Sequence, residues 1–243
     1  MMKLSRTVFH YRKVRANKDT EIEEALARLA ALHPEMGFGK FHAMLRREGK
    51  GWNHKRVYRV YCEMKLNKRR KHKRRLPARN PDPLSVPQAA NHSWSADFMS
   101  DALWDGRRFR TFNVVDDFNR EALAIEVDTS LPSARVTRVL DQIGEWRGLP
   151  ARLRFDNGPE FTAVAVADWA ETNGVELEFT QPGKPMQNGF IERFNRTYRE
   201  AVLDMYIFES LSDVRSQTER WLEIYNHHRP HDSLGGLPPS EYL

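Results

Sequence analysis

The chain is poor in cysteine, and this scarcity excludes a fold held together by disulfides. Cys62 is the one cysteine among 243 residues, and its neighbours Tyr61 and Met64 favour a small core residue. A single thiol cannot form a disulfide within the chain, which suits a reducing compartment. The sequence also lacks an apolar run long enough for a membrane span or a signal peptide. We therefore expect a cytoplasmic protein with no membrane partner.

The sequence also lacks cofactor-binding motifs and internal repeats. Its acidic residues are fewer than its basic residues. Neither a G-x-G-x-x-G nor a G-x-x-x-x-G-K motif occurs, so no dinucleotide or P-loop site is predicted. Lys and Arg total 39 against 33 Asp and Glu, which gives a net charge of +6. A basic excess attracts polyanions, and nucleic acid is the usual one.

The basic charge is concentrated in residues 65–75, and four prolines follow by residue 87. Such a segment cannot bury a core, and its like charges repel one another into an extended form. We interpret residues 67–89 as a linker that is either a solubilising spacer or, as we favour, a contact to DNA phosphates. Each phosphate neutralised would steepen the salt dependence of binding. The candidate contacts are Lys68, Arg69, Arg70, Lys71, Lys73, Arg74 and Arg75.

Ahead of the linker, the pattern predicts a small module of three helices. Thr20 and Glu23 have the spacing of a capping box, and an apolar stripe at helical intervals follows them. Further helices are expected at about residues 40–48 and 54–64, with Asn53 as the N-cap of the last one. The module serves either DNA binding or protein contacts. For DNA, the outward basic residues of the third helix are Lys55, Arg56 and Arg59.

The remaining periodicity predicts an α/β domain. Strands are expected at about residues 93–99, 109–115, 122–127, 151–155 and 175–179, and helices at about 133–147, 163–173 and 186–205. Three strands followed by alternating helices and strands give a mixed five-stranded sheet with flanking helices. The chain is thus divided into a tail at 1–19, a helical module at 20–66, a linker at 67–89, a core at 90–206 and a C-terminal segment at 207–243.

Three carboxylates stand out by their local context. Asp97 lies in a strand rich in aromatic residues, Asp156 follows a strand and precedes an Asn-Gly turn, and Glu192 lies on an amphipathic helix. The end of a strand is where open α/β sheets place their ligands. Between Asp156 and Glu192 lie 35 residues. Asp116 and Asp117 are rival acids, but their hairpin loop favours a role in the turn.

Converging carboxylates suit magnesium. Mg²⁺ prefers oxygen ligands, whereas Zn²⁺ prefers His and Cys. Two such ions roughly 3.5–4 Å apart can activate a nucleophile and neutralise a leaving oxygen in phosphodiester chemistry. The polar face beside Glu192 and the Gly/Pro-containing loop before it either contact DNA or are ordinary surface. Their candidate DNA contacts are Lys184, Gln187, Asn188, Asn195, Arg196 and Arg199.

The C-terminal segment carries a distinctive string. From residue 225 it reads Tyr-Asn-His-His-Arg-Pro-His-Asp-Ser-Leu-Gly, after a helix expected at about residues 213–228. We expect this tail to pack on the core, with Arg229 and His231 fixing it. The three histidines do not predict a metal site, because no cysteine or second histidine pair accompanies them.

Taken together, the two aspartates, the glutamate, the 35-residue gap and the tail string resemble the DDE transposases of the two-reading-frame bacterial insertion-sequence family, which are related to retroviral integrases. The resemblance extends over about residues 20–239. It implies the second-frame product, with a ribonuclease-H-like integrase core after a helix-turn-helix module. It also implies that Asp97, Asp156 and Glu192 are the catalytic residues and the ligands of two Mg²⁺ ions, with Mn²⁺ as a substitute.

The same resemblance implies a reaction and partners. Water would first cut at the end of the element, and the freed 3′-hydroxyl would then attack a second phosphodiester. The partners would be DNA at element ends and target, further copies of the chain in a multimer, and an upstream-frame protein or fusion, all at the bacterial nucleoid. The alternative is a non-catalytic DNA-binding fragment that represses or needs the upstream partner. A junction-resolving nuclease fits the fold but explains neither the gap nor the tail.

Overall fold

The computed structural model describes residues 19–68, 86–156, 164–180 and 188–242. These residues belong to two compact units, one within residues 1–72 and one within 73–243. Each unit has its own apolar core.

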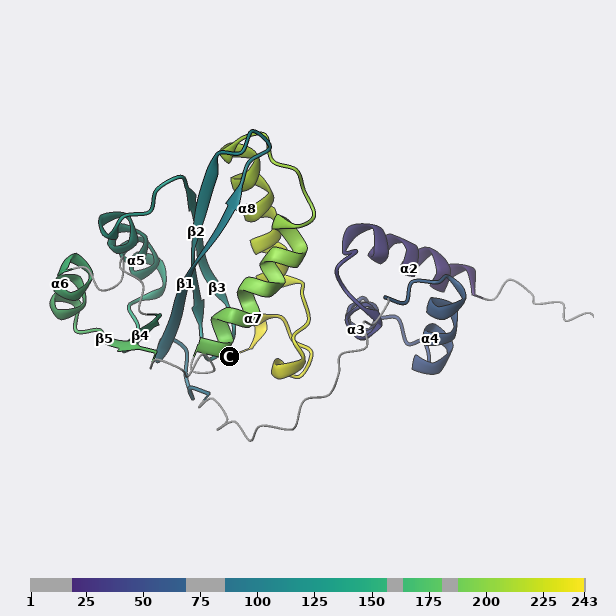
Figure 1. The fold of residues 1–243 in the computed structure, drawn as a ribbon. Coiled ribbons are helices and arrows are strands. Elements are labelled where there is room, and N and C mark those ends of the chain that lie inside the picture. The colour runs from purple at the N-terminus through teal and green to yellow at the C-terminus, as the bar shows by residue number, and fades with distance from the viewer. Residues whose placement is uncertain (1–18, 69–85, 157–163, 181–187, 243) are drawn as a thin grey trace, which may run out of the picture. The chain divides into compact units, whose positions relative to one another are not determined.

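The N-terminal unit is a bundle of three short helices (Figure 1). They are α2 (Thr20–Leu32), α3 (Phe38–Arg47) and α4 (His54–Glu63). Each helix buries apolar residues at three- and four-residue intervals, as an amphipathic helix does. The shared core contains Ile22, Leu26, Leu29, Phe41, Leu45, Val57, Val60 and Tyr61. The three-helix module predicted from the sequence is confirmed.

The two helix starts that the sequence marks have different outcomes. The Asn53 side chain accepts a hydrogen bond from the amide of Lys55 at 2.9 Å, so it caps α4 as expected. The predicted capping box at Thr20 is wrong. Helix α2 begins at Thr20 after Asp19, and no side-chain hydrogen bond caps it. Asp19 has helical dihedral angles, and its carboxylate points instead to arginines of α4.

The second unit is built on a five-stranded sheet in the order β3-β2-β1-β4-β5. The strands are β1 (Ser93–Ala102), β2 (Arg108–Asp116), β3 (Ala122–Asp128), β4 (Arg152–Phe155) and β5 (Glu176–Phe179). The pairs β1–β2 and β2–β3 are antiparallel, whereas β1–β4 and β4–β5 are parallel. The mixed five-stranded sheet predicted from the sequence is confirmed. Strand β1 runs three residues beyond its predicted end, because residues 100–102 pair with residues 108–110 of β2.

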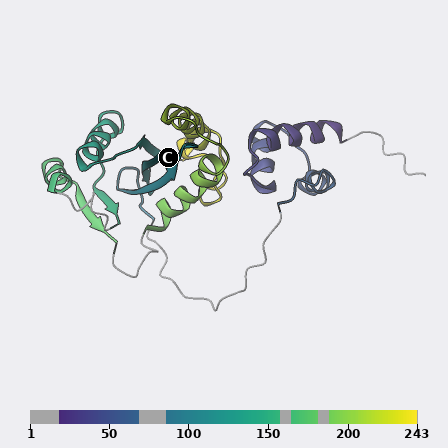
Figure 2. The same cartoon turned by 45° about the horizontal axis from the view of Figure 1, so that its top comes forward.

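Helices cover both faces of the sheet (Figures 1 and 2). One face carries α5 (Ser133–Arg147) and α6 (Val164–Asn173), and the other carries α7 (Gly189–Tyr198) and α8 (Leu211–His227). Because side chains alternate along β1, the strand contributes to a different apolar core on each face of the sheet. Trp94 and Ala96 belong to the core under α5 and α6. The polar residues at odd-numbered positions of β1 therefore face α7.

The long helix predicted at residues 186–205 is divided in the structure. Helix α7 ends at Tyr198, and a five-residue π-helical turn, η2 (Arg199–Leu203), continues it. The wider turn keeps Val202 and Leu203 buried in the core beneath α7 and α8. Such turns interrupt α-helices where packing requires a different spacing of side chains.

Helix α8 lies along the edge strand β3 and bonds to its main chain. The Asn226 side chain accepts from the amide of Ala122 and donates to the carbonyl of the same residue, both at 2.9 Å. Arg215 donates to the carbonyl of Val127 at 2.8 Å. The asparagine of the tail string is therefore a clamp on β3.

The rest of the tail packs on the same unit, as expected. His231 stacks edge-on against Tyr225, with ring centroids 4.9 Å apart, and Arg229 is buried. Asn119, in the loop between β2 and β3, donates to the carbonyl of Pro239 at 3.3 Å. Among the described residues, none of the helices has both the length and the hydropathy of a membrane span.

Candidate catalytic site

Strand register brings Asp97 and Asp156 to the same level of the sheet. In the parallel pair, Ser93 aligns with Arg152 and Ser95 with Arg154. Two residues further along both strands stand Asp97 and, directly after β4, Asp156. Because side chains alternate between faces, both carboxylates lie on the face that carries α7. The sheet therefore places the two aspartates on neighbouring strands.

Asp97 is held by a chain of two asparagine amides. The Nδ2 of Asn195, on α7, donates to Oδ2 of Asp97 at 2.7 Å. The Nδ2 of Asn113, opposite Asp97 on β2, donates to Oδ1 of Asn195 at 2.7 Å. Both asparagines are buried. This chain fixes one oxygen of Asp97 with neutral donors, and the amide of Phe98 binds the other at 2.8 Å.

Electrostatics connect all three predicted acids. Burial, together with the negative charges of Asp156 and Glu192, raises the pKa of Asp97 to about 6, against the lowering effect of its hydrogen bonds to Phe98 and Asn195. Glu192 precedes Asn195 by one turn and therefore shares its face of α7. Within the described part of the chain, Glu192 makes no hydrogen bond or ion pair. The charges of Asp156 and Glu192, from two other parts of the fold, thus act on Asp97.

The chemistry of these donors fits hard divalent cations. Carboxylates are the ligands that Mg²⁺ and Mn²⁺ take from proteins, and a cation would relieve the repulsion at Asp97. No three His, Cys, Asp or Glu side chains among the described residues converge closely enough here to hold an ion. The segments that flank Asp156 and precede α7, residues 157–163 and 181–187, lie outside the described residues.

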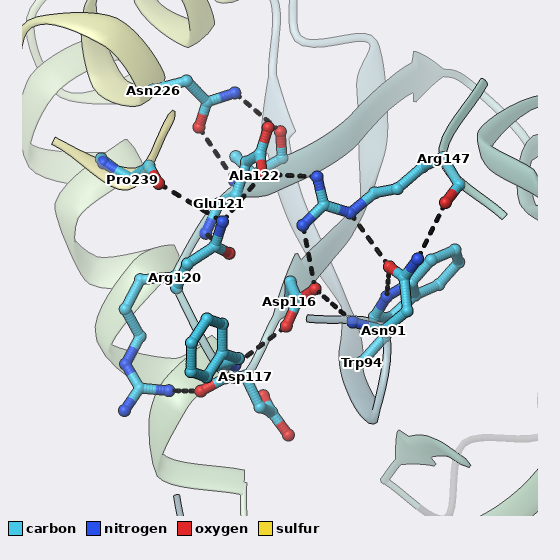
Figure 3. A network of polar contacts seen from close by, with 12 residues as sticks. Asn91, Trp94, Asp116, Asp117, Arg120, Glu121, Ala122, Arg147, Asn226 and Pro239 are labelled. Atoms are coloured by element: carbon cyan, nitrogen blue, oxygen red, sulfur yellow. Dashed lines mark hydrogen bonds and ion pairs between the residues drawn. The ribbon is translucent and has the colours of Figure 1, made fainter. Parts of the chain in front are cut away.

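Asp116, at the end of β2, has a structural environment of a different kind (Figure 3). Its side chain is fully buried and accepts three hydrogen bonds. The amide of Asn91 donates at 2.9 Å, the amide of Phe118 at 2.9 Å and the guanidinium of Arg147 at 3.0 Å. The expected role in the turn is what these contacts support.

Asp117 is also fully buried and paired. It accepts hydrogen bonds from the hydroxyls of Ser93 and Ser95 at 2.9 and 2.6 Å, and from Arg154 at 3.2 Å. Burial raises its pKa, while the serine hydrogen bonds and Arg154 lower it. Both acids of the loop therefore have an arginine partner.

Several predicted DNA contacts of α7 have internal partners. Asn195 is buried and bonded to Asp97, and Asn188 is buried at the start of the helix. Their predicted exposure on the polar face is wrong, because α7 lies closer to the sheet than its sequence pattern indicates. Arg199 is tied to β1, donating to Asp101 at 3.0 Å. Arg196 is exposed.

Some basic residues of α4 also have partners within the protein, whereas others are exposed. Arg56 and Arg59 form ion pairs with Asp19 at 2.7 and 2.6 Å, and both remain partly exposed. The hydrogen bond from Arg56 is the largest cause of the lowered pKa of Asp19. Lys55 is exposed, and exposed Lys68 donates to the carbonyl of Glu35. Lys184, Gln187, Arg69, Arg70, Lys71, Lys73, Arg74 and Arg75 lie outside the described residues.

Two residues of the site region were not identified from the sequence. Asn113 is a polar residue within the apolar run of β2, and that interruption is a signal of a buried contact. Arg120 lies in the loop after β2 with φ of 63°, a backbone conformation uncommon for a residue with a side chain. Its guanidinium lies over the ring of Phe190, at the start of α7. No pattern in the sequence indicates that contact.

Comparison with known structures defines the class of fold. The chain resembles the magnesium-bound catalytic core of HTLV-2 integrase with a TM-score of 0.50 and 16% identity, over 64% of this chain and 97% of that one. It resembles a chain of the simian T-cell lymphotropic virus intasome in complex with PP2A regulatory subunit B56 gamma, with a TM-score of 0.52 and 16% identity, over 89% and 73%. The second unit therefore has the ribonuclease-H-like fold of integrase cores.

Sequence comparison defines the family. The chain matches the family described as integrase core domain over residues 87–185 and again over 173–239, and an HTH-like domain over 16–74. It is 43% identical to the insertion element IS407 uncharacterized 31.7 kDa protein of Burkholderia multivorans, over 98% of this chain and 86% of that one. It is 28% identical to transposase InsD for insertion element IS2D of Escherichia coli, over 96% and 81%. The chain belongs to the DDE transposases of bacterial insertion sequences, in the retroviral-integrase superfamily.

Proposed function

We propose that this protein cuts DNA at the ends of its insertion element and joins them to target DNA, in a reaction that requires divalent metal. Membership of the family supports DNA transposition in general. The observation that carries the specific proposal is the shared level of Asp97 and Asp156, together with the electrostatic influence of Glu192 on Asp97. Acidic side chains gathered on one face, one of them buried with a raised pKa, are expected at a catalytic metal site.

In this proposal Asp97, Asp156 and Glu192 hold two Mg²⁺ ions, for which Mn²⁺ substitutes. Bound ions would neutralise charge on the scissile phosphate and favour attack by a hydroxyl oxygen. Asn195 keeps one oxygen of Asp97 fixed, so the other oxygen has a defined direction towards a ligand. Fixing a ligand through hydrogen bonds in this way is how proteins tune metal affinity.

The partners follow from the charge distribution. We propose that DNA binds Lys55, Lys68 and Arg196, which are exposed, and the basic residues of the linker. Arg56 and Arg59 would exchange Asp19 for phosphate on binding. Joining two ends to a target requires more than one copy of the chain on DNA, with or without an upstream-frame partner. Such a complex would act at the nucleoid.

A cleavage assay with matched variants tests the proposal. The full chain is incubated with labelled DNA that carries an element end, with Mg²⁺ or Mn²⁺, beside Glu192→Gln and Glu219→Gln. Glu219 is an exposed glutamate of α8 and serves as the control for charge. We expect metal-dependent nicking and joining from the wild type and the control only. Cleavage that survives Glu192→Gln contradicts the site, and binding without cleavage by any protein favours a repressor.

A further inference from the structure

Arg120 has a strained backbone and a side chain that reaches the helix of Glu192. The residue lies between Asp117 and the start of β3, with φ of 63°. Left-handed backbone conformations are readily adopted by glycine and are unfavourable for arginine. Strain of this kind persists where surrounding contacts impose it, and it gathers at functional sites. The side chain of Arg120 is therefore the place to look for the compensating contacts.

That side chain makes two contacts on the α7 side of the sheet. Its Nη1 donates to the carbonyl of Asp117 (Figure 3). The centre of its guanidinium lies 3.6 Å from the centroid of the Phe190 ring, a close cation–π contact. Phe190 stands in the first turn of α7, two residues before Glu192. Arg120 thus connects the β2–β3 loop to the start of the helix that carries the third acid.

The loop that carries Arg120 is itself anchored on both sides. Buried Asp116 and Asp117 fix its beginning through arginine partners. Asn226 holds Ala122 just after it (Figure 3). Asn119 donates to the carbonyl of Pro239 in the tail. An arginine on such a support can hold a helix end in place.

Glu192 has no other local restraint among the described residues. Its carboxylate is exposed and forms no hydrogen bond there, so its position depends on the backbone of α7. That backbone is held on one side by Asn195, which bonds to Asp97, and on the other by Phe190 under Arg120. We propose that Arg120 is a positioning residue, which fixes the first turn of α7 and thereby the Glu192 carboxylate. The proposal rests on the proposed role of Glu192 as a metal ligand.

The test compares Arg120→Gly and Arg120→Lys with Arg110→Ala in the full chain. Glycine accepts the backbone conformation but removes the guanidinium, and lysine restores the charge without the planar group. Arg110 lies 4.3 Å over the ring of Phe98 and provides the matched control, a cation–π contact elsewhere on the same sheet. The readouts are amide hydrogen exchange in residues 191–194, Mn²⁺ binding to DNA-free protein, and the Mg²⁺ concentration that gives half-maximal cleavage.

We expect Arg120→Gly to unfold cooperatively near the wild-type temperature, yet to exchange the α7 amides about tenfold faster. Its Mn²⁺ affinity should fall about 10- to 100-fold, as for other losses of groups that orient a metal ligand. Arg120→Lys should recover part of both effects, and Arg110→Ala should match the wild type. Phe190→Leu, which keeps an apolar side chain, should show the same faster exchange and weaker Mn²⁺ binding as Arg120→Gly. If Arg120→Gly does not fold, Phe190→Leu still tests the proposal.

Three results would overturn the proposal. One is unchanged exchange and Mn²⁺ binding in both Arg120→Gly and Phe190→Leu. Another is an equal effect from Arg110→Ala. The third is a loss of cleavage alone, which would assign Arg120 to DNA contact. A wild type that binds Mn²⁺ but never cleaves contradicts the proposed function instead, and the exchange and Mn²⁺ measurements still decide the role of Arg120.

Discussion

The α/β unit carries two groups of acids, and their surroundings differ. Asp116 and Asp117 are fully buried, and each is paired with an arginine. Among the described residues, Asp97 accepts hydrogen bonds only from neutral groups, and Glu192 has no hydrogen-bond or ion-pair partner. The first group is neutralised within the protein, whereas the second is left with like charges for neighbours.

Under the proposed function, this difference distinguishes acids that stabilise the fold from acids that would bind metal. A buried carboxylate without a compensating charge is costly, and such cost is kept where function needs it. A buried carboxylate with an arginine is a structural pair, and removal of one partner leaves the other exposed to an apolar environment. Substitution of Asp97 or Glu192 should therefore reduce activity more than stability, and substitution of Asp116 or Asp117 should reduce stability more than activity.

The largest expected effect is on activity, from Asp97→Asn. The asparagine keeps the shape but removes a charged ligand, so strand cleavage should fall at least about a thousandfold. The metal-free core should be as stable as the wild type or more stable, because the repulsion with Asp156 and Glu192 disappears. Cleavage rates and thermal unfolding measure the two effects. A stability loss as large as the activity loss would contradict the distinction.

Asp116→Ala should show the reverse behaviour. It removes one of two carboxylate partners of the partly buried Arg147 and the acceptor of two amides, so the free energy of unfolding should fall by about 3–5 kcal/mol. Denaturant unfolding of the variant measures this loss. Asp105→Ala is the control, because Asp105 forms an exposed pair with Arg107 and should change stability little. Any cleavage by the folded fraction should keep its wild-type metal dependence.

Asn195→Ala tests the connection between the groups and the helix. Removal of the amide frees Asp97 and leaves Asn113 without its acceptor. Metal-dependent cleavage should fall about 10- to 100-fold, and unfolding should lose only about 1–3 kcal/mol. Asn173→Ala, which removes a hydrogen bond within α6, is the matched control for stability. Equal cleavage by both variants would exclude a positioning role for Asn195.

The smallest effect is expected at Asp19, an acid that is paired but exposed. Asp19→Asn should raise DNA affinity a few-fold and steepen its salt dependence, because Arg56 and Arg59 become available to phosphates. The lowered pKa of Asp19 gives a second signature. Its contribution to stability is present above the unfolded pKa and is lost as the pH falls through the lower folded value. The variant should lack that acid-dependent loss, which pH titrations of unfolding would reveal.

The sequence was sufficient for the parts of the molecule that depend on local pattern. Alternation of polar and apolar residues locates the strands, and helical periodicity locates the helices. Asn53 marks the start of α4. Asp97 was predicted from the aromatic-rich strand around it, and Asp156 from the strand before it and the Asn-Gly turn after it. Their shared level on the sheet follows from the parallel register of β1 and β4.

Contacts between distant segments could not be predicted from the sequence pattern. Asn195 looks like a surface residue of an amphipathic helix, yet it turns inward because Asp97 and Asn113 offer it partners from two strands. Asp19 looks like a residue before a capping box, yet two arginines about 40 positions away compete for its carboxylate. Arg120 carries no local signal at all. Each of these roles depends on tertiary neighbours.

The contacts of α8 with β3 also affect whether a further strand can pair with this edge of the sheet. An edge strand offers its main chain to any further strand, and unprotected edges lead to aggregation. Asn226 and Arg215 occupy groups at both ends of β3. At the opposite edge, β5 is four residues long and carries two glutamates that bond to arginines of β4. These contacts at the two edges of the sheet oppose edge-to-edge strand pairing between copies of this chain.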